Sequence, residues 1–133
     1  MSTQTKLTND QNEPIRVLIV EDDALIAAEI ESTLTEAGAV VVAVTRSADE
    51  ALKRCEAYRP ALALIDVELP GVRDGIELAS ELALRLGVRA IFVTGHSDPQ
   101  SVLRAAPAKP LSWIKKPFGP GSIVAAVKLA MGQ

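Results

Sequence analysis

The chain has 133 residues, a formal net charge of −3, and a composition that is 48% hydrophobic but only 3% aromatic. At this length a single domain can bury about two thirds of its unfolded surface, so we expect one self-sufficient core and no second folded domain. The Lys and Arg residues are scattered along the chain, which argues against direct nucleic-acid binding because such binders gather cations against phosphates.

Cys55 is the only cysteine, so an intramolecular disulfide is excluded, and its place on an apolar helical face indicates a small buried side chain. No apolar run reaches the length of a membrane span, and the polar residues 1–14 lack the hydrophobic stretch of a signal peptide. We therefore expect a cytoplasmic protein with a disordered polar tail over residues 1–14 and one folded domain over residues 15–133.

From Ile15 onward, short runs of β-branched residues alternate with longer segments of helical period, which predicts βαβ units and an α/β fold with a parallel sheet. The expected strands are 15–20, 39–45, 61–65, 90–93 and 111–115. The expected helices are 23–37, 47–59, 76–86, 99–106 and 118–131. The low aromatic content agrees with this class, because aliphatic residues fill the core of a parallel sheet covered by helices.

Local signals mark the ends of these helices. Ser47 and Glu50 form a capping-box pattern at the start of the second helix. Gly38 and Gly87 follow the first and third helices, where a left-handed residue commonly ends a helix. Pro107 stops the fourth helix, because proline inside a helix costs about 3 kcal/mol.

Three consecutive acids, Glu21, Asp22 and Asp23, follow the first expected strand. Two unit charges about 4 Å apart repel by roughly 4 kcal/mol near a protein surface, so such a cluster normally needs a compensating partner. Polar residues also end the third, fourth and fifth expected strands: Asp66, Thr94 and Lys116. Because ligands of open parallel sheets bind beyond the carboxyl ends of the strands, these residues predict a single site.

The residue types at this edge favour a hard divalent cation. If the first and third strands are neighbours, about 4.8 Å apart, then Glu21, Asp22 and Asp66 can share one small ion. A few carboxylate oxygens, with room for water and a phosphate oxygen, suit Mg²⁺ better than zinc or copper.

Each of these residues also has a simpler explanation when it is taken alone. Asp22 and Asp23 can cap the helix that they precede and complement its dipole. Asp66 can begin a turn, Thr94 can bond to the backbone, and Lys116 can be a solvated surface charge. The site hypothesis rests on their shared position at one end of the sheet.

Four motifs, VEDD, LIDVELPG continued by DGIEL, FVTG and WIKKPF, resemble at these spacings the motifs of bacterial response-regulator receiver domains, the CheY-like family. The resemblance covers about residues 15–131. It implies a doubly wound sheet of five parallel strands in the order 2-1-3-4-5, numbered along the chain.

The resemblance further implies that Asp66 is a phosphoacceptor. It would receive its phosphoryl group from a histidine kinase, from a histidine phosphotransfer protein, or from a small donor such as acetyl phosphate. Mg²⁺ would be the cofactor, held by Glu21, Asp22, Asp66 and the main-chain carbonyl of Glu68.

Other residues match further positions of the family. Thr94 and Lys116 would contact the phosphoryl group, and the bond between Lys116 and Pro117 would be cis. Thr94 and Trp113 would form the switch that responds to phosphorylation. Residues that border the phosphoryl group and modulate dephosphorylation would be Glu68 and His96.

The chain departs from the family pattern at several places. The loop after Asp66 is one residue longer than usual, since Val72 and Arg73 separate Pro-Gly from Asp-Gly. Trp113 stands where Tyr or Phe is common. The fourth helix is shortened by Pro107 and Pro110, so the dimer contacts of many relatives are not expected.

We therefore expect a single-domain response regulator that assists its own phosphorylation and dephosphorylation but is not an enzyme on other substrates. It would signal by binding a downstream protein, without direct contact with nucleic acid or membrane. One alternative is a phosphate shuttle or sink with no effector of its own. A second is a phosphohydrolase with an aspartate nucleophile, suggested by Asp66, Val67 and Glu68.

Overall fold

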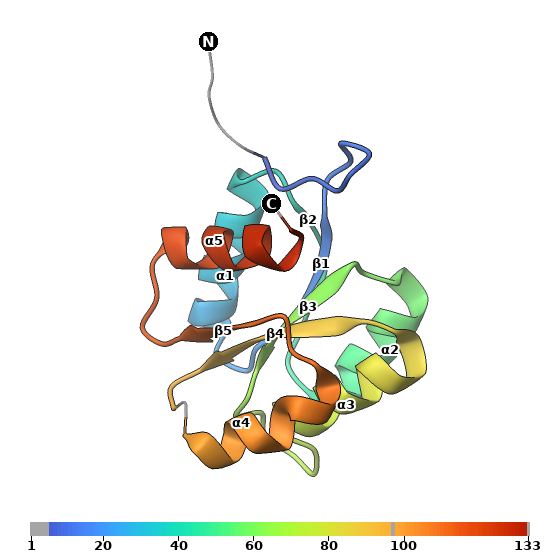
Figure 1. Ribbon diagram of the computed structural model, residues 1–133, viewed down its shortest axis with the longest axis vertical. Helices are drawn as coiled ribbons and strands as arrows, with labels where there is room; N and C mark the ends of the chain where they lie inside the picture. The colour runs from blue at the N-terminus through green and yellow to red at the C-terminus, as the bar shows by residue number, and fades with distance from the viewer. Residues whose placement is uncertain (1–5, 97, 133) are drawn as a thin grey trace.

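Runs of aliphatic residues form one sheet of five parallel strands in the computed structural model, within the residues that it describes, 6–96 and 98–132 (Figure 1). The strands are β1 (Arg16–Val20), β2 (Val40–Thr45), β3 (Leu62–Asp66), β4 (Arg89–Thr94) and β5 (Ser112–Lys115). Their order across the sheet is β2-β1-β3-β4-β5. This confirms the predicted doubly wound α/β fold and its strand order.

The helices also follow the predicted succession. They are α1 (Ala24–Glu36), α2 (Ala48–Tyr58), α3 (Gly75–Leu86), α4 (Pro99–Ala105) and α5 (Pro120–Ala130), with a 3-10 turn over Ala106–Ala108. Side chains of Asp23, Ser47, Asp74 and Asp98 accept hydrogen bonds from free backbone N–H groups at the starts of the first four helices. Pro107 lies in the 3-10 turn that ends α4.

Apolar side chains alternate along the inner strands and build a layer on each face of the sheet. On β1, Leu18 and Val20 face α2 and α3, whereas Val17 and Ile19 face α1 and α5. Figure 1 shows α1 and α5 side by side, away from α2 and α3. Because both faces are covered, the inner strands are continuous apolar runs, and their polar residues are confined to the strand ends.

Residues 6–14 pack against the domain, so the prediction of a disordered tail is wrong for this part of the chain; residues 1–5 lie outside the described residues. Leu7 is completely buried, its N–H donates to the Ala37 carbonyl at 2.9 Å, and its carbonyl accepts from the Ile15 N–H at 2.9 Å. One apolar residue in a polar stretch has no periodicity, which is why the sequence pattern did not reveal it.

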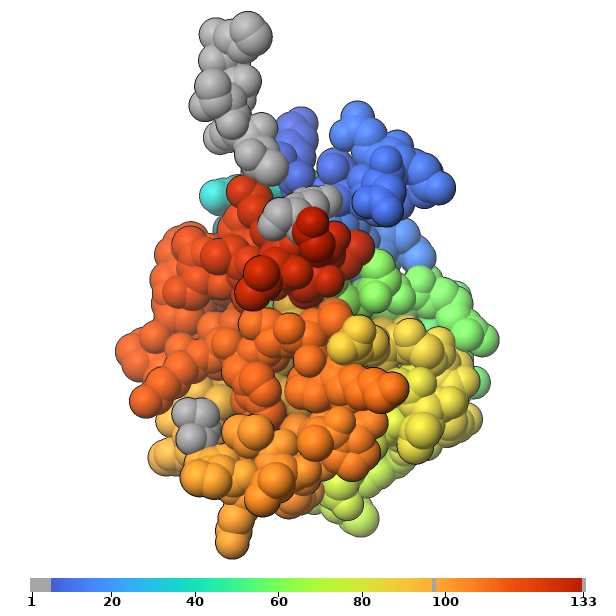
Figure 2. All heavy atoms as spheres, viewed as in Figure 1, coloured from blue at the N-terminus to red at the C-terminus, as the bar shows by residue number. Residues whose placement is uncertain are grey.

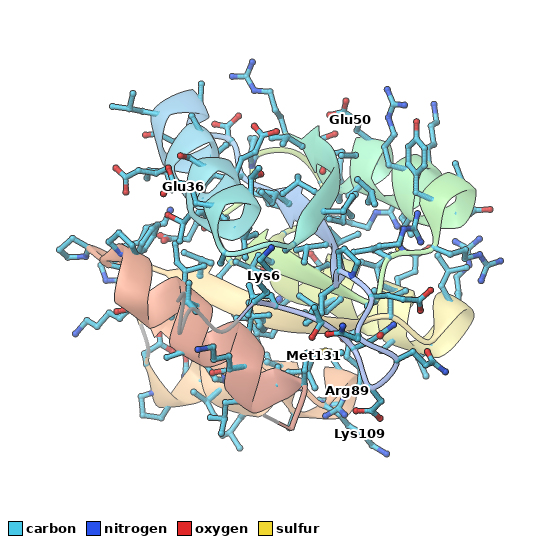
Figure 3. The ribbon with its side chains drawn as sticks, turned by 90° about the horizontal axis from the view of Figure 1, so that it is seen from above. Lys6, Glu36, Glu50, Arg89, Lys109 and Met131 are labelled. Atoms are coloured by element: carbon cyan, nitrogen blue, oxygen red, sulfur yellow. The ribbon has the colours of Figure 1, made fainter. Side chains whose placement is uncertain are left out.

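The segment closes one end of the molecule. Lys6 lies between α1 and α5 (Figure 3), and Gly38, with φ +95°, lets it approach, because a Cβ at Gly38 would be 3.0 Å from that of Lys6. Figure 2 shows residues 6–14 beside the C-terminal end of α5. Among the described residues, no helix has both the length and the apolar character that crossing a bilayer requires.

We expect Leu7→Ala to lower the free energy of unfolding by about 2–5 kcal/mol, because it removes a fully buried side chain from the layer under α1 and α5. Urea denaturation measures the change. Leu25→Ala is the matched control, since Leu25 is 78% exposed. A Leu7→Ala variant as stable as the Leu25→Ala variant would show that residues 6–14 do not hold to the domain in solution.

Candidate functional site

Strand register brings the polar strand ends to one edge of the sheet. Val20 pairs with Ile65, Asp66 with Val93, and Thr94 with Lys115, so the residues that follow these pairs lie close together. The described part of the chain buries four polar side chains, and all of them are at this edge: Glu21, Asp66, Thr94 and Thr45. The fourth, Thr45, donates its hydroxyl to the Ile19 carbonyl and is thereby satisfied.

The ammonium group of Lys116 lies between two carboxylates. Its Nζ is 3.3 Å from Asp66 Oδ2 and 3.2 Å from Glu21 Oε1. The backbone holds it there, because the Lys116 N–H donates to the Thr94 carbonyl at 2.8 Å. The Lys116–Pro117 bond is cis, as the resemblance implied. Three strand ends that are far apart in the sequence thus meet in one ion-pair cluster.

The charges in this cluster do not balance. Burial raises the pKa of Glu21, and the negative charge of Asp66 raises it further. Burial by itself would lower the pKa of Lys116, but the charges of Asp66 and Glu21 outweigh it and raise that pKa. Glu21 Oε1 is buried without a hydrogen bond among the described residues, although Nζ lies close enough for an ion pair. The cluster is one positive charge short.

Asp22 and Asp23 lie outside this buried pair. Asp22 is half exposed at the rim, with Oδ1 4.0 Å from Arg46 Nη2. Asp23 accepts the N–H groups of Leu25 and Ile26, so the simpler capping explanation is correct for Asp23. Within the described residues, no backbone N–H donates to the side chain of Asp22 in this way.

The donor atoms at this edge fit a hard divalent cation. The residues predicted to hold Mg²⁺ offer only oxygens, from Glu21, Asp22, Asp66 and the main chain of Glu68, and one buried carboxylate oxygen lacks a hydrogen bond. Within the described ranges, however, no three acidic, His or Cys side chains gather closely enough to hold a metal. The cation that lies between Glu21 and Asp66 here is the Lys116 ammonium.

The other predicted residues lie at the same edge of the sheet as Asp66. The Glu68 N–H donates to Asp66 Oδ1 at 2.9 Å and orients the carboxylate. The Thr94 hydroxyl is directed at the next loop, where it donates to the His96 carbonyl at 2.5 Å and accepts the His96 N–H at 3.0 Å. The side chains of Glu68 and His96 are both exposed.

Trp113 lies on β5 and is half buried. Its ring packs on Phe92, with the centroids 4.7 Å apart and an angle of 37° between the planes. It also lies against the apolar layer that contains Ala105. The structure therefore supports the packing role of Trp113, and its role as a switch stays a prediction.

Gly75 is a site residue that sequence analysis missed, because Asp-Gly was considered only as part of a motif and of the length of the loop after Asp66. A Cβ at Gly75 would lie 2.0 Å from the Asp66 carbonyl oxygen and 2.9 Å from Val67 Cα. Its N–H donates to the Val67 carbonyl at 2.9 Å. The absence of a side chain lets α3 begin against the backbone of Asp66.

Known proteins are similar to this chain in sequence and in fold. A family model described as the response regulator receiver domain matches residues 17–128. The transcriptional regulatory protein PdtaR of Mycobacterium tuberculosis is 35% identical over 120 residues, which are 90% of this chain and 58% of PdtaR. The phyllosphere-induced regulator PhyR of Methylorubrum extorquens is 33% identical over 116 residues, 86% of this chain and 43% of PhyR. The chain thus spans about half the length of these relatives.

A solved structure agrees over most of the chain. The signal receiver domain of a modulated diguanylate cyclase from Desulfovibrio desulfuricans G20 superposes with a TM-score of 0.84 at 32% identity. The match covers 90% of this chain and 95% of that domain.

We expect Gly75→Ala to destabilise the protein by at least about 1–3 kcal/mol, because the new methyl group overlaps the backbone of Asp66. Urea denaturation measures this. Gly121→Ala in α5 is the control: apart from the neighbouring backbone of its own helix, no described atom lies within 4 Å of its Cβ position, so a gain of up to about 1 kcal/mol is expected. Equal effects of the two substitutions would contradict the close approach at Gly75.

We expect Glu21→Gln to stabilise the metal-free protein at pH 7 by about 1–2 kcal/mol, because a neutral amide costs less to bury beside Asp66 than a carboxylate does. Because folding raises the pKa of Glu21, the folded state holds this proton more tightly, and the stability of the native protein falls as pH rises above the ordinary value of 4.5. The advantage of the variant should therefore vanish below that pH.

Urea denaturation across this pH range tests the sign of the effect. Glu31→Gln, at an exposed position of α1, is the control and should change little. A Glu21→Gln variant that is less stable at pH 7 would show that the ion pair with Lys116 outweighs the cost of burying Glu21.

Proposed function

The chain belongs to the response regulator receiver domain family, and from this premise we propose that it is a phosphorylation-controlled signalling domain whose phosphoacceptor is Asp66. The observation that carries the proposal is the buried Asp66 carboxylate, oriented by the Glu68 N–H and 3.3 Å from the Lys116 ammonium. A nucleophilic carboxylate beside a cation is what in-line phosphoryl transfer requires.

Transfer proceeds by attack of an Asp66 oxygen on the donor phosphorus, while the bond from phosphorus to the leaving group breaks and its electron pair departs with that group. Lys116 neutralises charge on the phosphoryl oxygens. Glu21, Asp22, Asp66 and the Glu68 carbonyl would hold Mg²⁺, which supplies further positive charge for these oxygens when it is bound.

Phosphorylation changes what Asp66 presents to its neighbours. One carboxylate oxygen becomes part of an acyl phosphate, with more negative charge and more acceptor atoms. The Thr94 hydroxyl, which now bonds to His96, then has a stronger acceptor on the other side. Its movement to the phosphoryl group frees the segment at His96 and alters the support behind Trp113.

The domain receives and passes on its signal through contacts with other proteins. We propose a histidine kinase or a histidine phosphotransfer protein as the donor and a downstream protein as the target. Water removes the phosphoryl group, at a rate that Glu68 and His96 influence from the exposed side of the site. Return of the phosphoryl group to a histidine faster than hydrolysis would identify the chain as a phosphate shuttle.

We expect the native protein to gain one phosphoryl group from acetyl phosphate with Mg²⁺, and Asp66→Asn to gain none, because an amide does not form the acyl phosphate. Intact-protein mass spectrometry measures the added mass. Asp10→Asn, at an exposed position, should behave as the native protein does. Phosphate that persists on the Asp66→Asn variant would overturn the assignment.

A further inference from the structure

The longer loop between β3 and α3 is anchored by ion pairs. Arg73, one of the two residues that separate Pro-Gly from Asp-Gly, donates to Asp49 Oδ1 at 2.5 Å in the first turn of α2. Its other terminal nitrogen pairs with Glu81 of α3. Val72, beside it at the loop tip, is fully exposed. Packing therefore does not hold the tip, and charged contacts do.

The next residue is anchored from another side. Asp74 Oδ1 accepts the Glu77 N–H at 2.9 Å and caps α3, while Asp74 Oδ2 accepts from Arg104 of α4 at 2.9 Å. Two consecutive loop residues are thus tied to α2, α3 and α4.

Both ends of this loop touch the phosphoacceptor. At one end the Glu68 N–H donates to Asp66 Oδ1. At the other end Gly75 lies against the Asp66 carbonyl and donates to Val67. A shift of the loop would therefore change the direction of the Asp66 carboxylate.

We propose that Arg73 is a positioning residue for phosphoryl transfer, whose pairs with Asp49 and Glu81 hold the loop so that the Glu68 N–H keeps Asp66 oriented. The inference rests on the proposed phosphorylation of Asp66. These ion pairs lie at the surface, where the Asp49 side chain is 79% exposed and that of Glu81 25%. Surface pairs contribute little to stability, so loss of the Arg73 side chain is expected to affect phosphoryl transfer more than folding. Orientation has larger effects on rate, because a displacement of about 1 Å can slow a reaction by about a hundredfold.

The test compares Arg73→Gln with Arg85→Gln. Arg85 pairs with the same Glu81, at 2.5 Å, and with Glu56, and within the described residues it has no ion pair with the loop. Both substitutions remove one positive charge from one network, so their melting temperatures should fall by similar small amounts. Only Arg73→Gln should affect the loop.

The first readout is phosphorylation by acetyl phosphate at saturating Mg²⁺. We expect Arg73→Gln to lower the maximal rate about fivefold or more through lost orientation, with the half-saturating donor concentration changed less than about twofold. Arg85→Gln should leave both values near those of the native protein. Arg73→Lys, which keeps the charge, should recover part of the rate.

The second readout needs no phosphorylation. Solvent exchange of the Glu68 amide hydrogen, followed by NMR, should be faster in Arg73→Gln than in the native protein, and unchanged in Arg85→Gln. Equal rates and equal exchange in the two variants would overturn the role of Arg73. A native protein that takes up no phosphoryl group from acetyl phosphate would overturn the proposed function itself.

Discussion

The central electrostatic interaction of this fold is the pairing of one ammonium group with two buried carboxylates. Lys116 meets Glu21 and Asp66 only because β1, β3 and β5 end at the same edge of a parallel sheet. The register that aligns these ends is set by alternating apolar residues, since a slip of one residue would exchange the two faces of a strand. The pattern that builds the apolar layers therefore also assembles the site.

The same pairing leaves a charge imbalance inside the fold. A buried carboxylate that is not fully compensated costs several kcal/mol, and the apolar layers on both faces of the sheet must offset that cost. On the proposed function, the imbalance is useful: a site that was already neutral and fully hydrogen-bonded would gain little from a cation. The charge imbalance appears in the described residues as Glu21 Oε1, a carboxylate oxygen that is buried without a hydrogen bond.

Sequence patterns predicted what depends on periodicity. The apolar runs predicted the strands and helices. Ligands of open parallel sheets bind beyond the carboxyl ends of the strands, and this predicted one shared edge for Glu21, Asp66, Thr94 and Lys116. Features that depend on a single contact were not predicted. Leu7 fills a space that only the folded α1 and α5 define, Gly75 is needed because of a backbone approach, and the Thr94 hydroxyl is directed by the path of the next loop.

In the loop after Asp66, individual side-chain contacts fix the conformation of a segment that has no periodic apolar pattern. Extra length gives a loop more conformations, and here Arg73 and Asp74 restrict them with partners on three helices. Of these helices, α4 is the least embedded, because Ala105 is its only buried residue. Arg104 ties α4 to Asp74, which stands next to the glycine that touches Asp66. On the proposed function, a shift of the loop at Asp66 can therefore reach α4 through one ion pair, without repacking either apolar layer.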